Sequence, residues 1–342
     1  MLTQWGEKLD KDNVLPEYPR PQMRRTSFIN LNGLWDYAFT AAGERQPDKW
    51  DGKILVPFSP ECELSGVGRV LSPDEYLWYR RDWAKPDFAE GDRVILHFGA
   101  VDQSCTVYIN GLRAFRHRGG YLPFEFDATG FLSKDVNEIS LSVRDVSDTS
   151  YHSRGKQRLK RGGIWYTPQS GIWQTVWAEC IPHDCIRQLH IIPDFDKACV
   201  NVRADTVGDS RAYAIFDGRQ YQLPASIPVP DFEPWSPENP RLYNFTVTCG
   251  EDRVESYFAM RKFSVEADSE GVKRLFLNGR PYFHNGLLDQ GYWSDGMYTA
   301  PSDEALIFDI QTAKDMGFNM LRKHIKIEPL RWYYHCDRLG ML

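Results

Sequence analysis

The sequence predicts a mainly β, multidomain protein whose last segment alternates strands and helices. Short apolar segments separated by turn signals fill the first half, and Asn110-Gly111 is the strongest hairpin signal. Alternating segments resume after residue 181, around a proline-rich stretch at 224–240. With 342 residues, the chain is long enough for two or three globular domains. We expect two β-sandwiches, the first a sandwich or jelly roll, followed by a βα region.

Three domains are expected, at 1–180, 181–265 and 266–342. The first begins with a polar, proline-punctuated arm at 7–25, which either packs against the next domain or forms a loose tail. The strands predicted for the first domain are 31–37, 53–56, 76–83, 93–98, 105–109, 138–143 and 173–179. The second domain has alternating strands and no catalytic constellation, and an immunoglobulin-like sandwich fits this pattern.

The last segment reads as strand, helix, strand, helix. An apolar strand at 282–288 precedes a helix that is capped by Ser302 and stops at Gly317. A second strand at 318–324 leads to a second helix at 329–340. Such a repeat favours a parallel sheet, and polar residues at the carboxyl ends of its strands would face a ligand. The residues at those ends are Asp289, Gln290 and His324.

Composition and charge argue against several kinds of partner. The chain has a net charge of −6 and 42% hydrophobic residues, so it is neither disordered nor basic, and nucleic acid is not expected as a partner. Its seven cysteines are scattered and lack a CxxC pair, which argues against a disulfide framework or a zinc site. We therefore expect no metal and no cofactor.

No targeting or membrane segment is predicted. Residues 1–7 lack a basic segment followed by an apolar run, and no stretch approaches eighteen uninterrupted apolar residues. A cytoplasmic protein without a membrane partner is expected. The alternative is a periplasmic or secreted protein whose signal peptide was removed.

Three motifs in the last segment occur in a characteristic order: the turn Leu-Asn-Gly-Arg-Pro at 277–281, the run Gly-Phe-Asn-Met-Leu-Arg at 317–322 and the run from Tyr333 to Gly340. They resemble the start of the catalytic (β/α)8 barrel of glycoside hydrolase family 2, the β-galactosidase, β-glucuronidase and β-mannosidase group. Earlier motifs that resemble the same family are 78–81, 97–102, 110–111, 119–124, 170–173, 234–243 and 257–262. The resemblance implies a jelly-roll sugar-binding domain, an immunoglobulin-like spacer and the first two βα units of the barrel.

The resemblance also implies a retaining exo-β-glycosidase that hydrolyses terminal β-glycosidic bonds with two carboxylates. A complete barrel takes about 250 residues, whereas the residues from Leu275 onward are enough for two of eight units. The catalytic glutamates are therefore expected beyond Leu342, and no catalytic residue is predicted within the chain. Asn137-Glu138 is rejected as the acid/base motif because it precedes a β-strand in the first domain.

Two other functional classes are open. A non-catalytic carbohydrate-binding or assembly module would explain the aromatic content of 14%, although sandwich cores also use aromatic residues. An unrelated adhesion protein would explain the sandwiches but not the βαβα ending. If the chain is part of a glycosidase, as the family resemblance implies, the expected partner is a carbohydrate, specifically a β-glycoside.

The candidate substrate contacts come from two parts of the chain. Asp289, Gln290, Trp293 and His324 should lie at one rim of the barrel segment, and Lys323 is an alternative occupant of the His324 position. The family resemblance adds Trp165, Tyr166 and Gln169 from the loop before the Ser-Gly-Ile motif. Each has a structural alternative: a turn residue for Asp289, a core ring for Trp293 and a satisfied structural histidine for His324.

The loop at 151–169 is strongly basic. Its cations are Arg154, Lys156, Arg158, Lys160 and Arg161. They could bind an anion, but a solvated loop neutralised by neighbouring acids is favoured because the chain is acidic and the run is not helical.

Two parallel strands without further partners would leave apolar side chains and backbone groups uncovered. We therefore expect self-association of the chain, which includes homo-oligomers.

Overall fold

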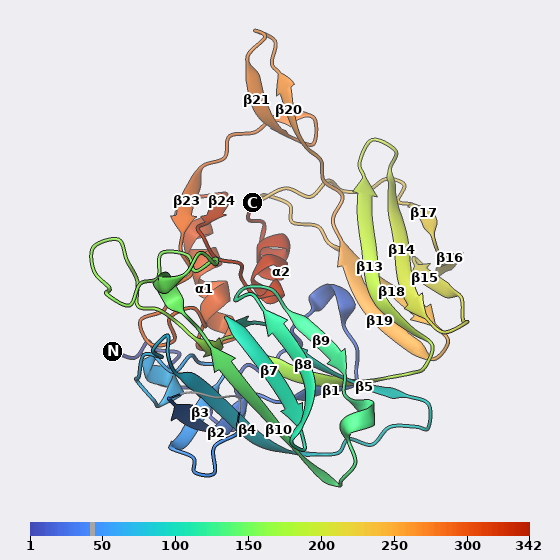
Figure 1. The fold of residues 1–342 in the computed structure, drawn as a ribbon. Helices are drawn as coiled ribbons and strands as arrows, with labels where there is room; N and C mark the ends of the chain where they lie inside the picture. The colour runs from blue at the N-terminus through green and yellow to red at the C-terminus, as the bar shows by residue number, and fades with distance from the viewer. Residues whose placement is uncertain (42–44) are drawn as a thin grey trace.

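The computed structural model describes residues 1–41 and 45–342, and most of its regular structure is β-strand, as predicted (Figure 1). The first sandwich has two antiparallel sheets, in the orders β3-β2-β4-β10-β7-β8 and β1-β12-β5-β9, with the small pair β11-β6 beside them. Its strands are β1 (Phe28–Asn30), β2 (Gly33–Thr40), β3 (Gly52–Val56), β4 (Tyr76–Ala84), β5 (Arg93–Phe98), β6 (Val101–Asp102), β7 (Ser104–Ile109), β8 (Leu112–Arg118), β9 (Phe124–Asp127), β10 (Val136–Arg144), β11 (Gly171–Ile172) and β12 (Val176–Ile181). Side chains from both sheets, among them Trp35, Tyr79 and Phe98, form one buried core.

The predicted hairpin at Asn110-Gly111 joins β7 to β8. Asn110 and Gly111 have φ values of 52° and 77°, the left-handed pair that a tight two-residue turn needs. Ile109 and Leu112 pair on either side of it. Local turn chemistry therefore sets the register at this edge of the sheet.

The second sandwich also has two antiparallel sheets, in the orders β13-β14-β17 and β16-β15-β18-β19. Its strands are β13 (Cys185–Asp194), β14 (Cys199–Val207), β15 (Ala212–Phe216), β16 (Arg219–Gln222), β17 (Ala225–Pro228), β18 (Tyr243–Cys249) and β19 (Asp252–Phe258). Its core contains Val200, Val247 and Met260. The alternating strands that the sequence predicts for this part of the chain are present.

The last segment starts with a hairpin that projects from the body of the molecule, seen at the top of Figure 1. Its elements are β20 (Phe263–Ala267), β21 (Lys273–Leu277) and the short β22 (Arg280–Pro281). A βα unit follows, made of β23 (Gly286–Asp289), α1 (Asp303–Asp315), β24 (Met320–Lys323) and α2 (Leu330–Leu339). β23 and β24 pair in parallel, as the sequence predicts. These two strands form a sheet of their own and not a closed barrel.

The first helix begins as expected, but the strand before it starts late. The Ser302 hydroxyl accepts the backbone N–H of Ala305 at 3.2 Å, and Gly317 follows the helix with φ 87°. The predicted strand at 282–288 was too long, because the chain still pairs with the hairpin: Tyr282 N–H donates to the Leu275 carbonyl at 2.9 Å. The parallel strand can begin only after this antiparallel pairing ends, at Gly286.

The N-terminal arm packs onto the rest of the molecule and is not a loose tail. Val14 and Tyr18 are buried, and the short helix η1 (Pro21–Met23) lies against β19. Trp5 contacts Trp293 and Phe308 of the βα unit, with ring centroids 5.8 Å and 5.0 Å away. The arm therefore touches the second sandwich and the βα unit.

A buried ionic network, centred on Glu179 of β12, holds the arm in place. Arg20 Nη2 and Arg25 Nη1 from the arm lie 2.5 Å and 3.4 Å from Glu179 Oε2, and the Tyr18 hydroxyl donates to Oε1. Arg25 also binds Asp252 of β19 through two nitrogens, each at 2.8 Å. Burial alone would raise the pKa of the Glu179 carboxyl, but Arg20 and the other partners lower it to about 2.

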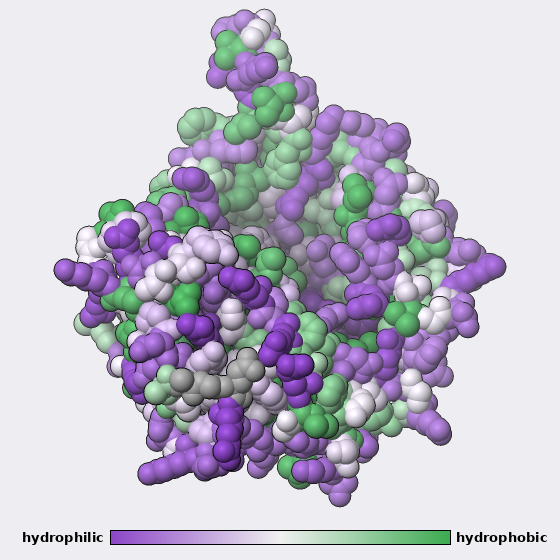
Figure 2. Space-filling view, in the orientation of Figure 1, coloured by the Kyte–Doolittle hydropathy of each residue, from purple (hydrophilic) through white to green (hydrophobic). Residues whose placement is uncertain are grey.

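The face of the molecule seen in Figure 2 is largely hydrophilic and is hollowed between the helices and the second sandwich. None of the helices that the structure describes has the length and apolar character needed to span a membrane.

The substitution Glu179→Gln tests the ionic network. It leaves Arg20 and Arg25 without their shared negative partner, so we expect the free energy of unfolding at pH 7 to fall by about 3 kcal/mol. The pKa of Glu179 is lowered by folding from its ordinary value of 4.5, so its stabilisation is present above about pH 4.5 and is lost as the pH falls towards 2. Urea denaturation at pH 7 and pH 3 measures both effects.

Glu255→Gln is the matched control. Glu255 pairs with Arg24 at 3.7 Å, but both side chains are more than half exposed, so its loss should change stability by less than about 0.5 kcal/mol. Equal losses in the two variants, or a Glu179→Gln loss of the same size at pH 3, would contradict this role of Glu179.

Candidate functional site

The basic loop at 151–169 of the first sandwich lies against the segments that follow β23 and β24. We call this junction the seam; it is formed by residues 151–169, 289–298 and 322–328. Gln169 joins its two sides, because its Nε2 donates to the Tyr292 hydroxyl at 3.1 Å and its Oε1 accepts the Tyr298 N–H at 2.9 Å. The rings of Tyr166 and Tyr292 are 4.7 Å apart. These contacts fix the loop relative to the βα unit.

The backbones of Asp289 and His324 come together at the ends of the two parallel strands. The His324 N–H donates to the Asp289 carbonyl oxygen at 2.8 Å. The Asp289 side chain, however, binds Lys323, whose Nζ lies 2.6 Å from Oδ2, while Oδ1 accepts the Gly291 N–H at 2.8 Å. Lys323, considered only as an alternative to His324, is thus the residue that contacts this carboxylate.

A second buried lysine extends this charged cluster. Lys323 Nζ lies 2.8 Å from Glu328 Oε1, and Lys326 Nζ lies 2.9 Å from the same oxygen. Lys326 also donates to the carbonyl oxygens of Gly291 and Tyr298, both at 2.7 Å. Burial lowers the pKa of Lys326, whereas Glu328 and Asp289 outweigh burial at Lys323 and raise its pKa. Each ammonium is therefore held by several oxygens.

Several polar side-chain atoms of the seam lack partners. His324 Nε2 and Gln290 Oε1 are buried and form no hydrogen bond within the described part of the chain. Burial and the nearby charges of Lys156 and Arg322 lower the pKa of His324, so its imidazole is neutral at pH 7. Buried polar atoms without partners are uncommon in native proteins, and a bound ligand can satisfy them.

The other predicted contacts have different surroundings. Trp165 lies under the Arg158 guanidinium, 3.6 Å from it, and is half-buried like Tyr166. Gln169 is fully buried with its amide bonded to protein groups, and Trp293 is 8% exposed and packs against Trp5. Gln169 and Trp293 have almost no surface to offer a ligand, and their contacts position the neighbouring side chains instead.

Sequence reasoning missed Tyr292, Lys326 and Glu328. The alternation of Lys326 and Glu328 directly after a predicted strand was an available signal, because charged residues in such a place need a partner when they are buried. Tyr292 had no local signal, since its role depends on the loop that it meets. Within residues 1–41 and 45–342, no group of His, Cys, Asp and Glu is arranged to hold a metal ion.

A cleft of about 1150 Å³ lies outside the seam, between the arm, β19 and α2. Three of its arginines are already paired: Arg24 with Glu255, Arg25 with Asp252, and Arg331 with Asp303. Its charges are therefore largely neutralised by the protein itself.

Comparison with known proteins identifies the family. The profile described as "Glycosyl hydrolases family 2, sugar binding domain" matches residues 69–177, and "Glycosyl hydrolases family 2" matches residues 186–261. The chain belongs to glycosyl hydrolase family 2. The two matches cover the first sandwich and the second, and they confirm the resemblance seen in the sequence motifs.

Named relatives agree with this family. A putative β-glucuronidase of Formosa agariphila is 26% identical over 323 residues, which are 86% of this chain and 36% of the relative. A β-galactosidase of Enterobacter cloacae is 25% identical, covering 91% of this chain and 34% of the relative. The chain thus spans about a third of the length of these curated relatives.

Solved structures show the same fold. A Faecalibacterium prausnitzii β-glucuronidase matches with a TM-score of 0.77 at 21% identity, covering 95% of this chain and 60% of that one. A β-glucuronidase of an uncultured Clostridium species matches with a TM-score of 0.78 at 21% identity, covering 94% and 59%.

Two carboxylates of the seam, Asp289 and Glu328, share one cation. Retaining glycosidases set two carboxyl groups about 5 Å apart, with the scissile bond between them. Asp289 and Glu328 are close neighbours, but the Lys323 ammonium occupies the space between them.

Lys323→Met tests the charged cluster. Asp289 and Glu328 lose the cation that they share, so we expect the unfolding free energy at pH 7.5 to fall by about 3 kcal/mol. Folding raises the pKa of Lys323 above its ordinary value of 10.5, so its stabilisation is present below about pH 10.5 and is lost as the pH rises further. The loss caused by the substitution should therefore be smaller at about pH 11.5. Urea denaturation at the two pH values measures it.

Lys273→Met, on the exposed strand β21, removes a lysine that has no ion pair among the residues the structure describes. It should leave stability almost unchanged at both pH values. A pH-independent loss for Lys323→Met would show that the lysine acts through packing alone.

Proposed function

We propose that this chain provides the substrate-facing front of a retaining exo-β-glycosidase that hydrolyses terminal β-glycosidic bonds. The observation that carries the proposal is the seam, where the His324 N–H donates to the Asp289 carbonyl and the Tyr166 ring packs on Tyr292. His324 Nε2 and Gln290 Oε1 of the same seam are buried without a partner among the described residues. A β-glycoside offers hydroxyl groups for such polar atoms and an apolar ring face for aromatic side chains. The printed names of the relatives, β-galactosidase and β-glucuronidase, support a β-glycoside as substrate.

We further propose a division of the chain at 1–180, 181–265 and 266–342. The first part would be the sugar-binding jelly roll, the second an immunoglobulin-like spacer and the third the first two βα units of a (β/α)8 barrel. Residue 342 supports the last assignment, because its N–H donates to the Asn319 carbonyl and its own carbonyl accepts the Leu321 N–H, both at 2.8 Å. A third strand beside β24 would start in this way.

The outer edge of the βα unit is apolar and uncovered. Phe283 is 81% exposed and Leu288 is 52% exposed, and β23 has a neighbour only on one side within the described residues. Further barrel strands would cover this edge. Without them we expect the isolated chain to self-associate.

We expect this chain to bind β-glycosides without hydrolysing them. We expect phenyl β-galactoside, β-glucuronide or β-mannoside to bind with a millimolar dissociation constant, measured by ligand-observed NMR, and to release no phenol. Asp289→Asn and Tyr166→Ala should each weaken binding about tenfold, because one removes a charged acceptor and the other a ring.

Tyr151→Ala is the control, since Tyr151 belongs to the same loop but is 90% exposed. It should leave binding unchanged. Phenol release that disappears in Asp289→Asn would contradict the proposal that the seam binds without cleaving. Absence of binding by all three glycosides would contradict the sugar-binding role, and the alternative, an assembly module, would then explain the fold.

A further inference from the structure

We infer that a cavity between the N-terminal arm, the first sandwich and the βα unit is a binding site for a small, neutral aromatic molecule of one or two rings. We call it the arm cavity; its volume is about 200 Å³. The inference does not rest on the proposed function, because the glycoside is expected in the seam. The aromatic molecule would be a second ligand, bound at a different place on the same chain.

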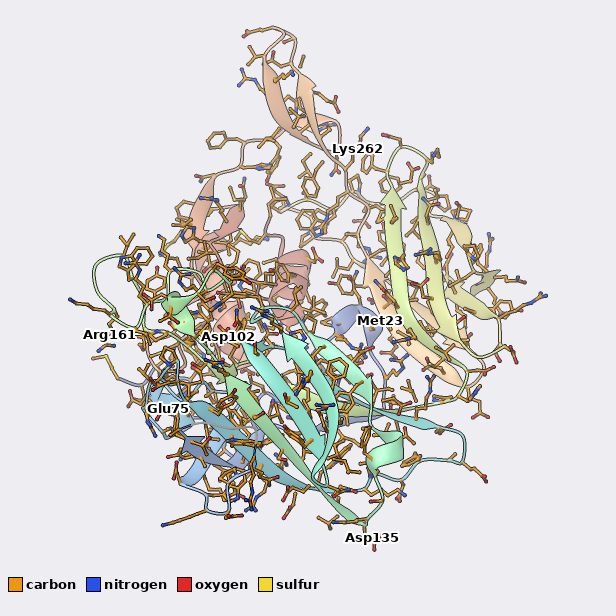
Figure 3. The ribbon with its side chains drawn as sticks, viewed as in Figure 1. Met23, Glu75, Asp102, Asp135, Arg161 and Lys262 are labelled. Atoms are coloured by element: carbon orange, nitrogen blue, oxygen red, sulfur yellow. The ribbon has the colours of Figure 1, made fainter. Side chains whose placement is uncertain are left out.

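The arm cavity is separate from the basic loop. Pro19, Thr175 and Leu306 bring the arm, the first sandwich and α1 to its wall, whereas none of the described residues of the basic loop lines it. The arm continues from Pro19 to Met23, and Figure 3 shows Met23 and Arg161 of the loop on opposite sides of the molecule. The cavity therefore meets the seam through the βα unit and not through the loop.

Aromatic rings form part of the wall. Tyr121, Trp173 and Tyr298 lie with their ring centroids 5.3 to 6.2 Å apart, and Trp177 also lines the cavity. The polar groups of Trp173 are already bonded inside the protein. Its indole N–H donates to a backbone carbonyl at 2.7 Å, and its own carbonyl accepts the Thr299 hydroxyl at 2.6 Å. The ring of Trp173 thus offers apolar surface, on which another aromatic ring packs well.

Three exposed aliphatic side chains line the same cavity. Leu122 is 58% exposed, Ile327 is 44% exposed and Leu330 is 51% exposed. They come from two segments that are distant in the sequence. Exposed apolar side chains that gather around a concave site mark a binding surface, whereas scattered ones need no explanation.

The volume of the cavity limits the size of its ligand. An apolar cavity of about 150 Å³ is large enough to bind benzene. The arm cavity, at about 200 Å³, therefore accommodates one or two rings, but not a helix with a diameter of about 10 Å. A small molecule fits, and a peptide helix does not.

The charged residues of the wall leave one acceptor for a ligand. Four of them take part in ion pairs: Arg20, Asp303, Glu328 and Arg331. Glu17 also lines the cavity and makes no ion pair among the residues that the structure describes. Its carboxyl group is suited to accept a hydrogen bond from an N–H or O–H group of the ligand.

Cations already lie over two of the rings. The Arg20 guanidinium carbon is 5.7 Å from the centre of the Trp177 ring, and the Lys326 ammonium is 5.0 Å from the centre of the Tyr298 ring. A positively charged ligand would be repelled by these cations, and a negatively charged one would be repelled by Glu17. The wall therefore favours an uncharged ligand.

The test measures the binding of small aromatic molecules to the full chain by isothermal titration calorimetry at pH 7.5. Indole is the main probe, and benzofuran has the same shape without the N–H. We expect a submillimolar dissociation constant and a negative heat-capacity change for indole, with benzofuran about fivefold weaker. Benzoate and benzylammonium, which carry charge, should bind at least about tenfold more weakly than indole.

Variants locate the probe on the protein. Leu122→Ser and Leu330→Ser should each weaken indole about threefold, because each removes apolar contact. Glu17→Leu should remove the advantage of indole over benzofuran. Leu112→Ser is the matched control, since Leu112 is 63% exposed on the first sandwich but does not line the cavity, and it should leave binding unchanged.

Several results would overturn the inference. Absence of indole binding would show that the cavity holds only solvent, and equal binding of indole and benzylammonium would exclude a site for neutral molecules. A loss for Leu112→Ser as large as that for Leu122→Ser would show non-specific adsorption to exposed leucines. Displacement of indole by methyl β-glucoside would place the probe in the seam and not in the arm cavity.

Discussion

The burial of the Glu179 carboxylate is the constraint on which the rest of the structure depends. A carboxylate that is 1% exposed is stable in its charged form only if cations and hydrogen-bond donors surround it. Its partners come from different parts of the chain: Arg20 and Arg25 from the arm, and His97 from the neighbouring strand β5, whose Nε2 is 3.0 Å away. Arg25 then extends the network to Asp252 of the second sandwich. The arm is thus the element through which the two sandwiches are joined by buried charge.

The same arm reaches the βα unit and so helps to define the seam. The Tyr18 carbonyl accepts a hydrogen bond from Arg331 Nη1 at 3.3 Å, and Arg331 binds Asp303 at the start of α1. Just before the arm, Trp5 packs on Trp293 of the seam. The site therefore lies between two bodies that are fixed by contacts outside it. Within the site, a second buried ionic cluster has Lys323 at its centre. This one cation binds both Asp289 and Glu328 near the ends of the two parallel strands.

The sequence predicted the features that depend on local chemistry. The Asn110-Gly111 hairpin, the cap at Ser302 and the stop at Gly317 follow from backbone preferences of a few residues, and all three are present. The motifs that resemble glycosyl hydrolase family 2 assigned the chain to the correct family, because they preserve the spacing of turns and core residues. What could not be predicted depends on distant pairing: the late start of β23, the burial of Gln169, and the choice of Lys323 over His324 as the partner of Asp289. Gln169 and Lys323 meet partners more than thirty residues away, in the βα unit and in the other strand. The start of β23 depends on how long the chain stays paired with the hairpin before it.

The most direct measurement of the central claim is a crystal structure of the chain soaked with phenyl β-glucuronide. The account predicts that the sugar lies in the seam, within hydrogen-bond distance of Asp289 and His324. A sugar bound instead in the cleft between the arm, β19 and α2, with the seam empty, would contradict it.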